Sequence, residues 1–141
     1  MKKYRENRFG LCISIINRAA QGYFYHKLKG FKIGPGQQAY LLALLPGETI
    51  FQEELAKRLK VDKANVTRAI KGLEKNDYIL RARSPMDKRA WEISLSKKGI
   101  RIRAEIERIS KEWIDILKKP LSDSDWNTLE EYLYQIAIAL D

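Results

Sequence analysis

Several residue types are scarce in this sequence of 141 residues, and each scarcity excludes a class of structure. The single cysteine, Cys12, excludes a disulfide within the chain. One histidine beside that cysteine is too little for a four-ligand zinc site in one chain, so no metal site is expected. Apolar runs such as "YLLALL" at 40–45 are far too short to span a bilayer. Because the N-terminus has no signal peptide, we expect a cytoplasmic protein without membrane contact.

The motifs of common enzyme classes are also missing. The sequence has no Gly-rich phosphate loop, no plausible pair of nucleophile and base, and no cluster of metal ligands. Carboxylates for acid–base chemistry are present, but nothing groups them in one cleft. We therefore expect a protein that is not an enzyme and that uses no cofactor.

Basic residues are abundant, but they are unevenly distributed. Apolar residues make up 45% of the chain and charged residues 32%, which is typical of one folded domain, and the net charge is +9. Residues 120–141 contain five acidic residues and no Lys or Arg, so residues 1–119 carry +14. A generally basic cytosolic protein is one interpretation of the charge. The asymmetry favours the other, attraction to a polyanion such as nucleic acid.

Apolar residues that recur every three or four positions predict a mainly helical chain with a small pair of strands. Asp62, Ser96 and either Ser122 or Asp123 are suited to begin helices, and Asn76-Asp77 to end one. The predicted helices cover 5–29, 37–45, 51–60, 62–76, 97–119 and 122–140, and the predicted strands cover 48–50, 78–83 and 90–95.

The helices within 51–76 have the spacing of a helix-turn-helix, with the turn near "KVDKA". The second helix of such a motif enters the major groove of double-stranded DNA, where Arg pairs with guanine and Asn with adenine. An ordinary amphipathic helix with a solvated face is the alternative. The polar side chains that lie off its apolar stripe are Lys63, Asn65, Thr67, Arg68 and Lys71.

Residues 81–95, "RARSPMDKRAWEISL", place basic residues around a Ser-Pro turn between two predicted strands. A solvated loop explains the polarity of Arg83, Lys88 and Arg89, but not the excess of positive charge. A two-stranded wing beside a recognition helix reaches an adjacent minor groove or the flanking phosphates. The hairpin therefore favours the DNA-binding interpretation of the preceding helix.

Residues 54–99 resemble the winged-helix core of the MarR family of transcription factors. The shared features are the helix-turn-helix, a Leu-Glu-Lys helix end, Asp-x-Arg in the wing, and Leu-Ser-x-x-Gly at the start of the next helix. Two residues depart from the pattern: Asp77 stands where the family often has Gly, and Ser96 where it often has Thr. The resemblance implies that Asp87 and Arg89 pair, with Arg89 directed into the minor groove.

The same resemblance implies the organisation of the chain. The fold class is mainly α with a small β-wing, and residues 1–141 form a single unit. Residues 31–96 would form the winged helix DNA-binding portion, with dimerisation helices in 1–30 and 97–141. The wide apolar stripes at both ends of the chain agree with a homodimer. The alternative assigns the aromatic residues there to intrachain core or plain surface, namely Trp113, Trp126, Tyr132 and Tyr134.

Regulators similar to this chain are often released from DNA by a small phenolic or aromatic carboxylate effector. Arg18, His26 and Tyr40 are the candidate residues for such a crevice, with Arg18 pairing the carboxylate. Each also has an ordinary interpretation, respectively an ion pair, an exposed histidine and a core tyrosine.

Cys12 suggests a thiol-based peroxide sensor, because "LCISIINRA" resembles the OhrR-like branch of the family. That branch supplies two tyrosines to the cysteine, whereas this chain has His26 and Gln37 at the matching places. A small buried apolar residue is the alternative interpretation of Cys12.

Together these features predict a sequence-specific DNA-binding transcriptional regulator, a repressor by resemblance, that binds a pseudo-palindromic operator as a homodimer. A nonspecific architectural DNA-binding protein remains an alternative, as does a winged helix that contacts protein or RNA.

Overall fold

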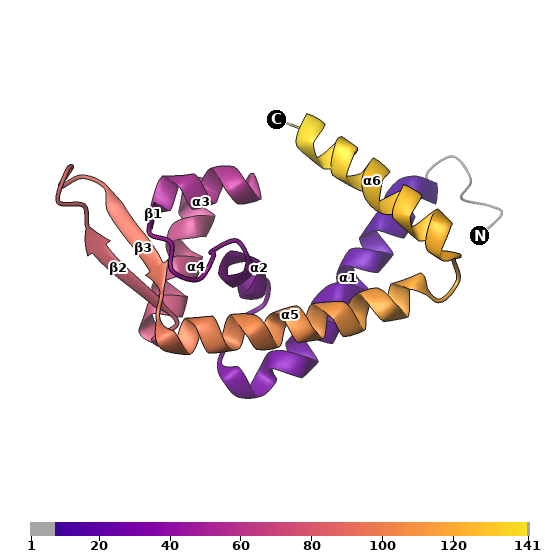
Figure 1. Cartoon of the computed structure of the whole chain (residues 1–141), viewed down its shortest axis with the longest axis horizontal. Helices are drawn as coiled ribbons and strands as arrows, with labels where there is room; N and C mark the ends of the chain where they lie inside the picture. The colour runs from indigo at the N-terminus through magenta and orange to yellow at the C-terminus, as the bar shows by residue number, and fades with distance from the viewer. Residues whose placement is uncertain (1–7, 141) are drawn as a thin grey trace.

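Six α-helices and a three-stranded sheet make up the part of the chain that the computed structural model describes, residues 8–140 (Figure 1). This confirms the predicted fold class, mainly α with a small β-wing. The predicted helical residues 5–7 lie outside the described residues. In chain order the elements are α1 (Arg8–Leu28), η2 (Lys29–Phe31), α2 (Gln37–Leu42), β1 (Ile50–Phe51), α3 (Gln52–Leu59), α4 (Lys63–Lys75), β2 (Ile79–Arg83), β3 (Trp91–Leu95), α5 (Lys97–Lys118) and α6 (Asp123–Ala139).

Side chains begin three of the helices at the predicted positions. Asp62 caps α4 by accepting from the Asn65 backbone N–H at 2.8 Å, and Ser96 caps α5 by accepting from Gly99 N–H at 2.9 Å. Of the two candidates for α6, Ser122 is the cap. Asp77 has a φ of 63°, the left-handed conformation that ends α4 and turns the chain into β2.

The helix predicted over residues 37–45 is shorter than expected, because α2 ends at Leu42. Pro46 disfavours the helical conformation of the residue before it. The Glu48 carboxylate then accepts from the Leu45 backbone N–H at 2.7 Å and closes a turn. The predicted strand at 48–50 is likewise displaced, to Ile50–Phe51.

The sheet is antiparallel, with the order β1-β3-β2. Arg83 pairs with Trp91 and Ile79 with Leu95, so the two long strands project as a hairpin beyond the helices (Figure 1). The short β1 joins the other side of β3, with Ile50 opposite Ile93. The hairpin is thus anchored at its base and open to solvent at its tip.

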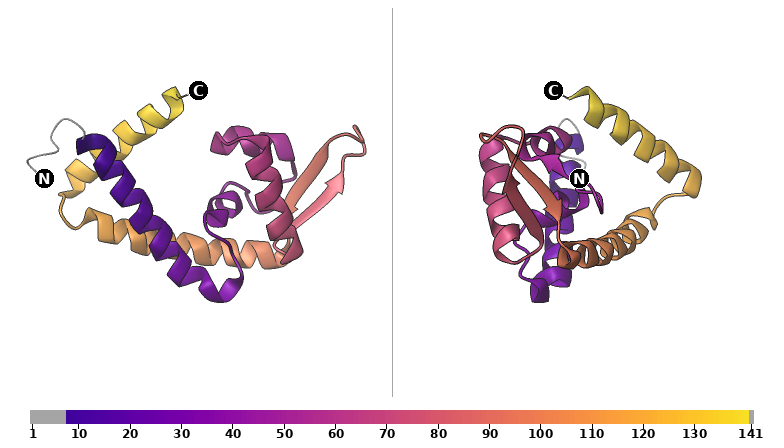
Figure 2. Two further views of the ribbon diagram at one scale, coloured as in Figure 1. Left: turned by 180° about the vertical axis from the view of Figure 1, so that it is seen from behind. Right: turned by 60° about the vertical axis from the view of Figure 1, so that its left-hand side comes forward.

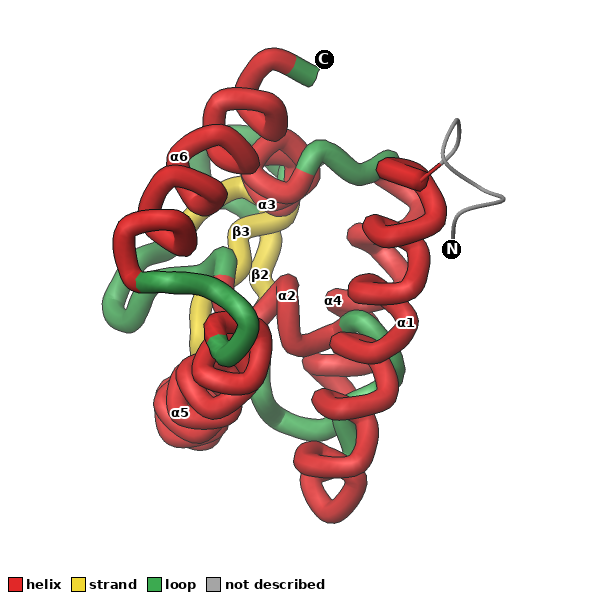
Figure 3. The backbone as a smooth tube through the Cα atoms, turned by 90° about the vertical axis from the view of Figure 1, so that its right-hand side faces the viewer, coloured by secondary structure: helices red, strands yellow, loops and turns green. Residues whose placement is uncertain are grey.

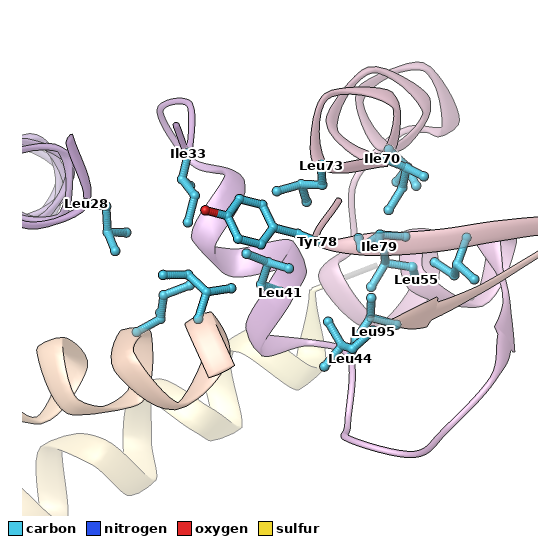
Figure 4. Close-up of a cluster of buried hydrophobic side chains, with 14 of the residues drawn as sticks. Leu28, Ile33, Leu41, Leu44, Leu55, Ile70, Leu73, Tyr78, Ile79 and Leu95 are labelled. Carbon is cyan, nitrogen blue, oxygen red and sulfur yellow. The ribbon is translucent and has the colours of Figure 1, made fainter. Parts of the chain in front are cut away.

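A core of aliphatic side chains lies where α2, α3, α4 and the sheet meet the first half of α5 (Figure 4). α5 contributes Ile102, Ile106 and Ile109 to this core. The other fully buried side chains include Leu41, Leu44, Leu55, Ile70, Leu73, Ile79 and Ile93. This packing fixes α3 and α4 relative to the base of the hairpin.

α5 runs from the sheet to the opposite end of the molecule, where it meets α1 and turns into α6 (Figures 1 and 2). Tyr23 of α1 packs on Trp113 of α5, with 5.2 Å between ring centroids. α6 lies apart from α1 in the view along α5 (Figure 3). Trp126 is buried within the chain, but Tyr132 and Tyr134 are more than half exposed.

None of the helices in residues 8–140 is both long and apolar enough to cross a membrane.

Candidate nucleic-acid interface

The first turns of α4 present a linked set of polar side chains to solvent. Asn65 donates its side-chain amide to Asp62 at 2.8 Å and accepts a hydrogen bond from the Arg68 guanidinium. Lys63 forms an ion pair with Glu53 of α3 at 3.0 Å. The side chains of Lys63, Asn65 and Arg68 are all exposed, as is that of Lys71 one turn further along.

Thr67 differs from the other four residues predicted on this helix. It is half-buried, and its hydroxyl donates to the Lys63 carbonyl at 2.9 Å and accepts from the Gln52 amide at 3.2 Å. Because α3 crosses α4 at this point, the hydroxyl is occupied by contacts between the two helices. Thr67 is therefore less accessible than its four neighbours, and its predicted contact with DNA stays a prediction.

The tip of the hairpin is organised around Ser84, which is 1% exposed. Its hydroxyl accepts from the backbone N–H of Met86 at 3.2 Å and of Asp87 at 3.4 Å. Its own backbone N–H donates to the Ala90 carbonyl at 2.9 Å. This buried serine holds the exposed Lys88 and Arg89 on a defined turn.

The expected ion pair between Asp87 and Arg89 takes a different form. Asp87 Oδ1 accepts from the backbone N–H of Arg89 at 2.9 Å, Arg89 is exposed, and within residues 8–140 no ion pair joins the two side chains. A carboxylate two residues before an amide closes this local turn readily. Asp87 therefore shapes the wing backbone, which leaves the charge of Arg89 available.

Two arginines of β2 stack on Trp91 of β3. The guanidinium carbons of Arg81 and Arg83 lie 4.0 Å and 3.9 Å from the centroid of its ring. Arg81 also pairs with Glu74 of α4 at 3.0 Å, and Arg83 donates to the Arg89 carbonyl at 3.3 Å. Of this group, sequence reasoning identified only Arg83 and Arg89.

A groove of about 520 Å³ separates α3 and the start of α4 from the wing. Lys63 and Arg89 line its opposite sides, and Trp91 and Thr67 lie in its wall. The predicted recognition helix and the predicted wing tip thus direct basic residues toward one shared space, which neither segment indicates alone.

The three residues predicted to line an effector crevice lie apart. Tyr40 borders a groove of about 470 Å³ with Asn65 and Arg68. Arg18 and His26 are exposed on α1 and line neither this groove nor the one beside the wing; Arg18 contacts Ser14, and His26 packs edge-on against Tyr25. Neither of these two grooves therefore brings the three residues together, and the effector crevice that they were predicted to line stays a prediction.

Burial raises the pKa of Tyr40 above its usual value, and the negative charge of Asp62 adds to this effect, while Arg68 opposes it. The phenol is therefore protonated at neutral pH and able to donate a hydrogen bond into its groove. Cys12 carries a free, half-buried thiol on α1.

Comparisons with known proteins agree with this geometry. The model of the MarR family matches residues 37–91. The HTH-type transcriptional regulator BilQ of Clostridioides difficile is 29% identical over 109 residues, which cover 77% of this chain and 74% of BilQ.

Solved structures extend the similarity to the end helices. A MarR transcriptional regulator from Methanosarcina mazei Go1 has a TM-score of 0.84 and 31% identity, with 93% of this chain and 94% of that one covered. A variant of MarR from E. coli, solved in complex with operator DNA, has a TM-score of 0.81 over 94% of this chain and 96% of that one; at 24% identity this likeness concerns the fold alone.

Proposed function

The chain belongs to the MarR family of winged helix-turn-helix transcriptional regulators, and we propose that it represses transcription as a homodimer bound to a pseudo-palindromic operator. The observation that carries the DNA contact is the shared groove, with Lys63 of α4 on one side and Arg89 of the wing on the other. Basic residues on both sides of one groove can attract the phosphates that flank a helix placed in the major groove.

Within each half-site, α4 enters the major groove. Arg68 and Asn65 contact each other in the free protein, and on binding they exchange this contact for base edges. Lys63 and Lys71 approach phosphates. Thr67 holds α4 on α3 through Gln52 and so acts through the position of the helix.

The wing supplies the second contact. Arg89 enters the adjacent minor groove, and Lys88 neutralises a flanking phosphate. Asp87 and Arg83 support the turn from which these two side chains project, through the Arg89 amide and carbonyl respectively.

The chain is one unit with two parts. Residues 31–96 bind DNA, and residues 1–30 and 97–141 dimerise. Support comes from the exposed apolar side chains at the ends, which include Ile13 and Ile16 on α1 and Leu133 and Ile136 on α6. Burial of these faces against a second copy would place two α4 helices on one face of DNA.

We test the DNA contact with Arg68→Glu and Arg89→Glu, measured by fluorescence anisotropy across a salt series. The probes are the DNA upstream of the gene, the tightest duplex selected by the parent from a random pool, and a scrambled duplex. Each variant should lose affinity by roughly tenfold or more, because a phosphate or base contact becomes a repulsion. The matched control is Lys119→Glu, an exposed charge reversal at the far end of α5.

Unchanged affinity in both variants would contradict this interface. Equal binding of all three duplexes, fading steeply with salt, would indicate an architectural protein in place of an operator-specific regulator.

A small aromatic carboxylate or phenol is the effector that we propose. Its support is the groove of about 470 Å³ where Tyr40 lies beside Arg68. A carboxylate paired with Arg68 there would compete directly with DNA, and Tyr40 would donate to it or stack on it. The anisotropy assay is repeated with salicylate and, separately, with peroxide: release by salicylate supports this groove, whereas release by peroxide alone would transfer the role to Cys12.

A further inference from the structure

We propose that Trp91 is a positioning residue that sets the orientation of the wing relative to α4, by holding Arg81 and Arg83 on either side of its indole ring. This inference rests on the proposed DNA-binding function, which it deepens by assigning a role to three residues of the hairpin strands. The experiment below separates its failure from a failure of that function.

The arrangement follows from the register of the hairpin. Arg83 lies directly opposite Trp91, and Arg81 lies two residues before Arg83, on the same face of β2. Both guanidinium groups are about 4 Å from the centre of one ring. Two cations that both lie about 4 Å from one ring centre would crowd and repel each other over a single face, so we place the indole between them.

The stack has a fixed end on the recognition helix. Arg81 Nε lies 3.0 Å from Glu74 Oε2, and the Arg81 side chain is only 16% exposed. Glu74 lies in the last turn of α4, which the core holds in place through Leu73. The first guanidinium of the stack is therefore held beside α4 by an ion pair, without a directed hydrogen bond from Nε.

The other end of the stack reaches the wing tip. Arg83 Nη1 donates to the carbonyl of Arg89 at 3.3 Å. A continuous series of contacts thus runs from Glu74 through Arg81, Trp91 and Arg83 to the backbone of the residue that we place in the minor groove.

The indole also resolves a conflict of charge. Arg81 and Arg83 have the same sign, and the π face between them attracts both cations. Without the ring, their repulsion favours separation and Arg83 turns to solvent. The Arg89 carbonyl then loses its donor, and the wing tip samples many positions relative to α4. In that state Arg89 reaches the minor groove only in a fraction of the molecules, which lowers the apparent affinity by that fraction.

The test is a double-mutant cycle of Trp91→Ala and Arg89→Ala, with anisotropy on the tightest duplex selected by the parent protein. If Trp91 acts by placing Arg89, each single variant should bind DNA about tenfold more weakly than the parent. The double variant should then bind less than about twofold more weakly than Arg89→Ala alone, because the loss of Trp91 no longer matters when Arg89 is absent. Trp91→Phe, which keeps an aromatic face, should restore most of the loss.

The control is Leu80→Ala, which removes an exposed apolar side chain from β2 of the same sheet and should leave affinity unchanged. Melting temperatures of all variants identify any that fail to fold. Losses that simply add in the double variant would overturn the positioning role, as would full affinity in Trp91→Ala.

Hydrogen exchange tests the role of Trp91 in the free protein, so its result does not depend on the proposed DNA binding. Hydrogen exchange of the Ser84 and Ala90 amides, which close the wing turn, should accelerate in Trp91→Ala and remain slow in Trp91→Phe. Unchanged exchange would show that the stack does not hold the wing. Accelerated exchange together with full DNA binding by Arg89→Ala would keep the stack and reject the minor-groove role of the wing.

Discussion

Gly99 lies in the first turn of α5, where the helix packs closely against the backbone of Tyr78. A Cβ added there would lie 2.0 Å from the carbonyl oxygen of Tyr78. The same contact is closed by Ser96, whose hydroxyl donates to the Asp77 carbonyl and accepts from the Gly99 amide. The backbone N–H of Ser96 also donates to the Tyr78 carbonyl at 3.1 Å, so the cap of α5 contacts the backbone just before β2.

Gly99→Ala should therefore destabilise the fold by roughly 2–4 kcal/mol, because the clash is with backbone and no flexible side chain can yield. Chemical denaturation with urea measures the free energy of unfolding directly. Gly30→Ala is the matched control, since a Cβ there meets nothing within 4 Å. Equal stabilities of the two variants would mean that α5 shifts away from Tyr78 at little cost.

Residues whose partners are three positions away were predictable from the sequence, and residues whose partners lie across the hairpin were not. Asp62 and Ser96 cap their helices as expected because the bonded amide is local. The sequence analysis assigned no role to Ser84 or Trp91, although a turn over residues 84–90 would have predicted the pairing of the strands on either side of it. A hairpin closed there places residue 83 opposite residue 91, and an arginine facing a tryptophan is a recognisable pair.

At the scale of elements, α2 and α3 are joined by an ion pair between Glu48 and Arg58. The carboxylate accepts two bonds from the guanidinium, at 2.5 and 3.1 Å, and Arg58 also donates to the Ala43 carbonyl at 2.9 Å. The hydrogen bond from Arg58 lowers the pKa of the Glu48 carboxyl below its usual value, and the Leu45 amide adds to this. The pair therefore closes the end of α2 against α3.

A carboxyl whose pKa is lowered on folding stabilises the protein above its unfolded pKa, and this contribution disappears as the pH falls through the folded pKa. Glu48→Gln should cost about 1 kcal/mol at pH 7, since the pair is partly exposed. The difference from the parent should shrink as the pH falls from 7 to below the folded pKa. Urea unfolding at several pH values measures it, with Asp115→Asn, an exposed carboxylate on α5, as the control. A difference that is constant with pH would argue against the ion pair as its source.

The apolar stripes of the helices were predictable, but the partners of those stripes were decided by packing. α4 buries Val66, Ile70 and Leu73 against the core, as its 3–4 spacing predicts. α6 has a comparable spacing, yet in residues 8–140 Trp126 is its only buried side chain. Periodicity therefore identifies an apolar face without saying whether that face is covered within the chain.

At the scale of the whole molecule, the described chain leaves large apolar side chains uncovered at the end opposite the wing. Leu133 and Ile136 of α6 are 42% and 50% exposed, and Ile16 of α1 is 44% exposed. Exposed apolar side chains in this number are typical of an interaction site on a protein that is otherwise highly charged. A second copy of the chain is the occupant that we propose.

Light scattering after gel filtration should accordingly give a mass twice that of the 16.4 kDa chain. Leu133→Asp should raise the dissociation constant of the dimer by roughly 100-fold, because two unpaired carboxylates would be buried in a symmetric interface. Leu80→Asp, on an apolar residue of the hairpin that is 58% exposed, is the control and should remain dimeric. A parent protein that stays monomeric at all concentrations would reject the dimer and the palindromic operator together.

The sequence by itself determined the properties that depend on near neighbours and on averages over many residues. These are the helices and their caps, the hairpin, the basic character of α4 and the wing, and the resemblance to the MarR family. Hydrogen bonds that span three or four residues and apolar periodicity make such features local, so they can be recognised without knowing the fold.

Only the tertiary structure decided which side chains meet. It set the hydroxyl of Thr67 against Gln52, brought Tyr40 beside Arg68 in one groove, and brought the guanidinium groups of Arg81 and Arg83 to about 4 Å from the ring of Trp91. The reason is geometric. Contacts between elements depend on strand register and on the crossing of helices, and a change of one residue or a few ångströms in either replaces one set of partners with another.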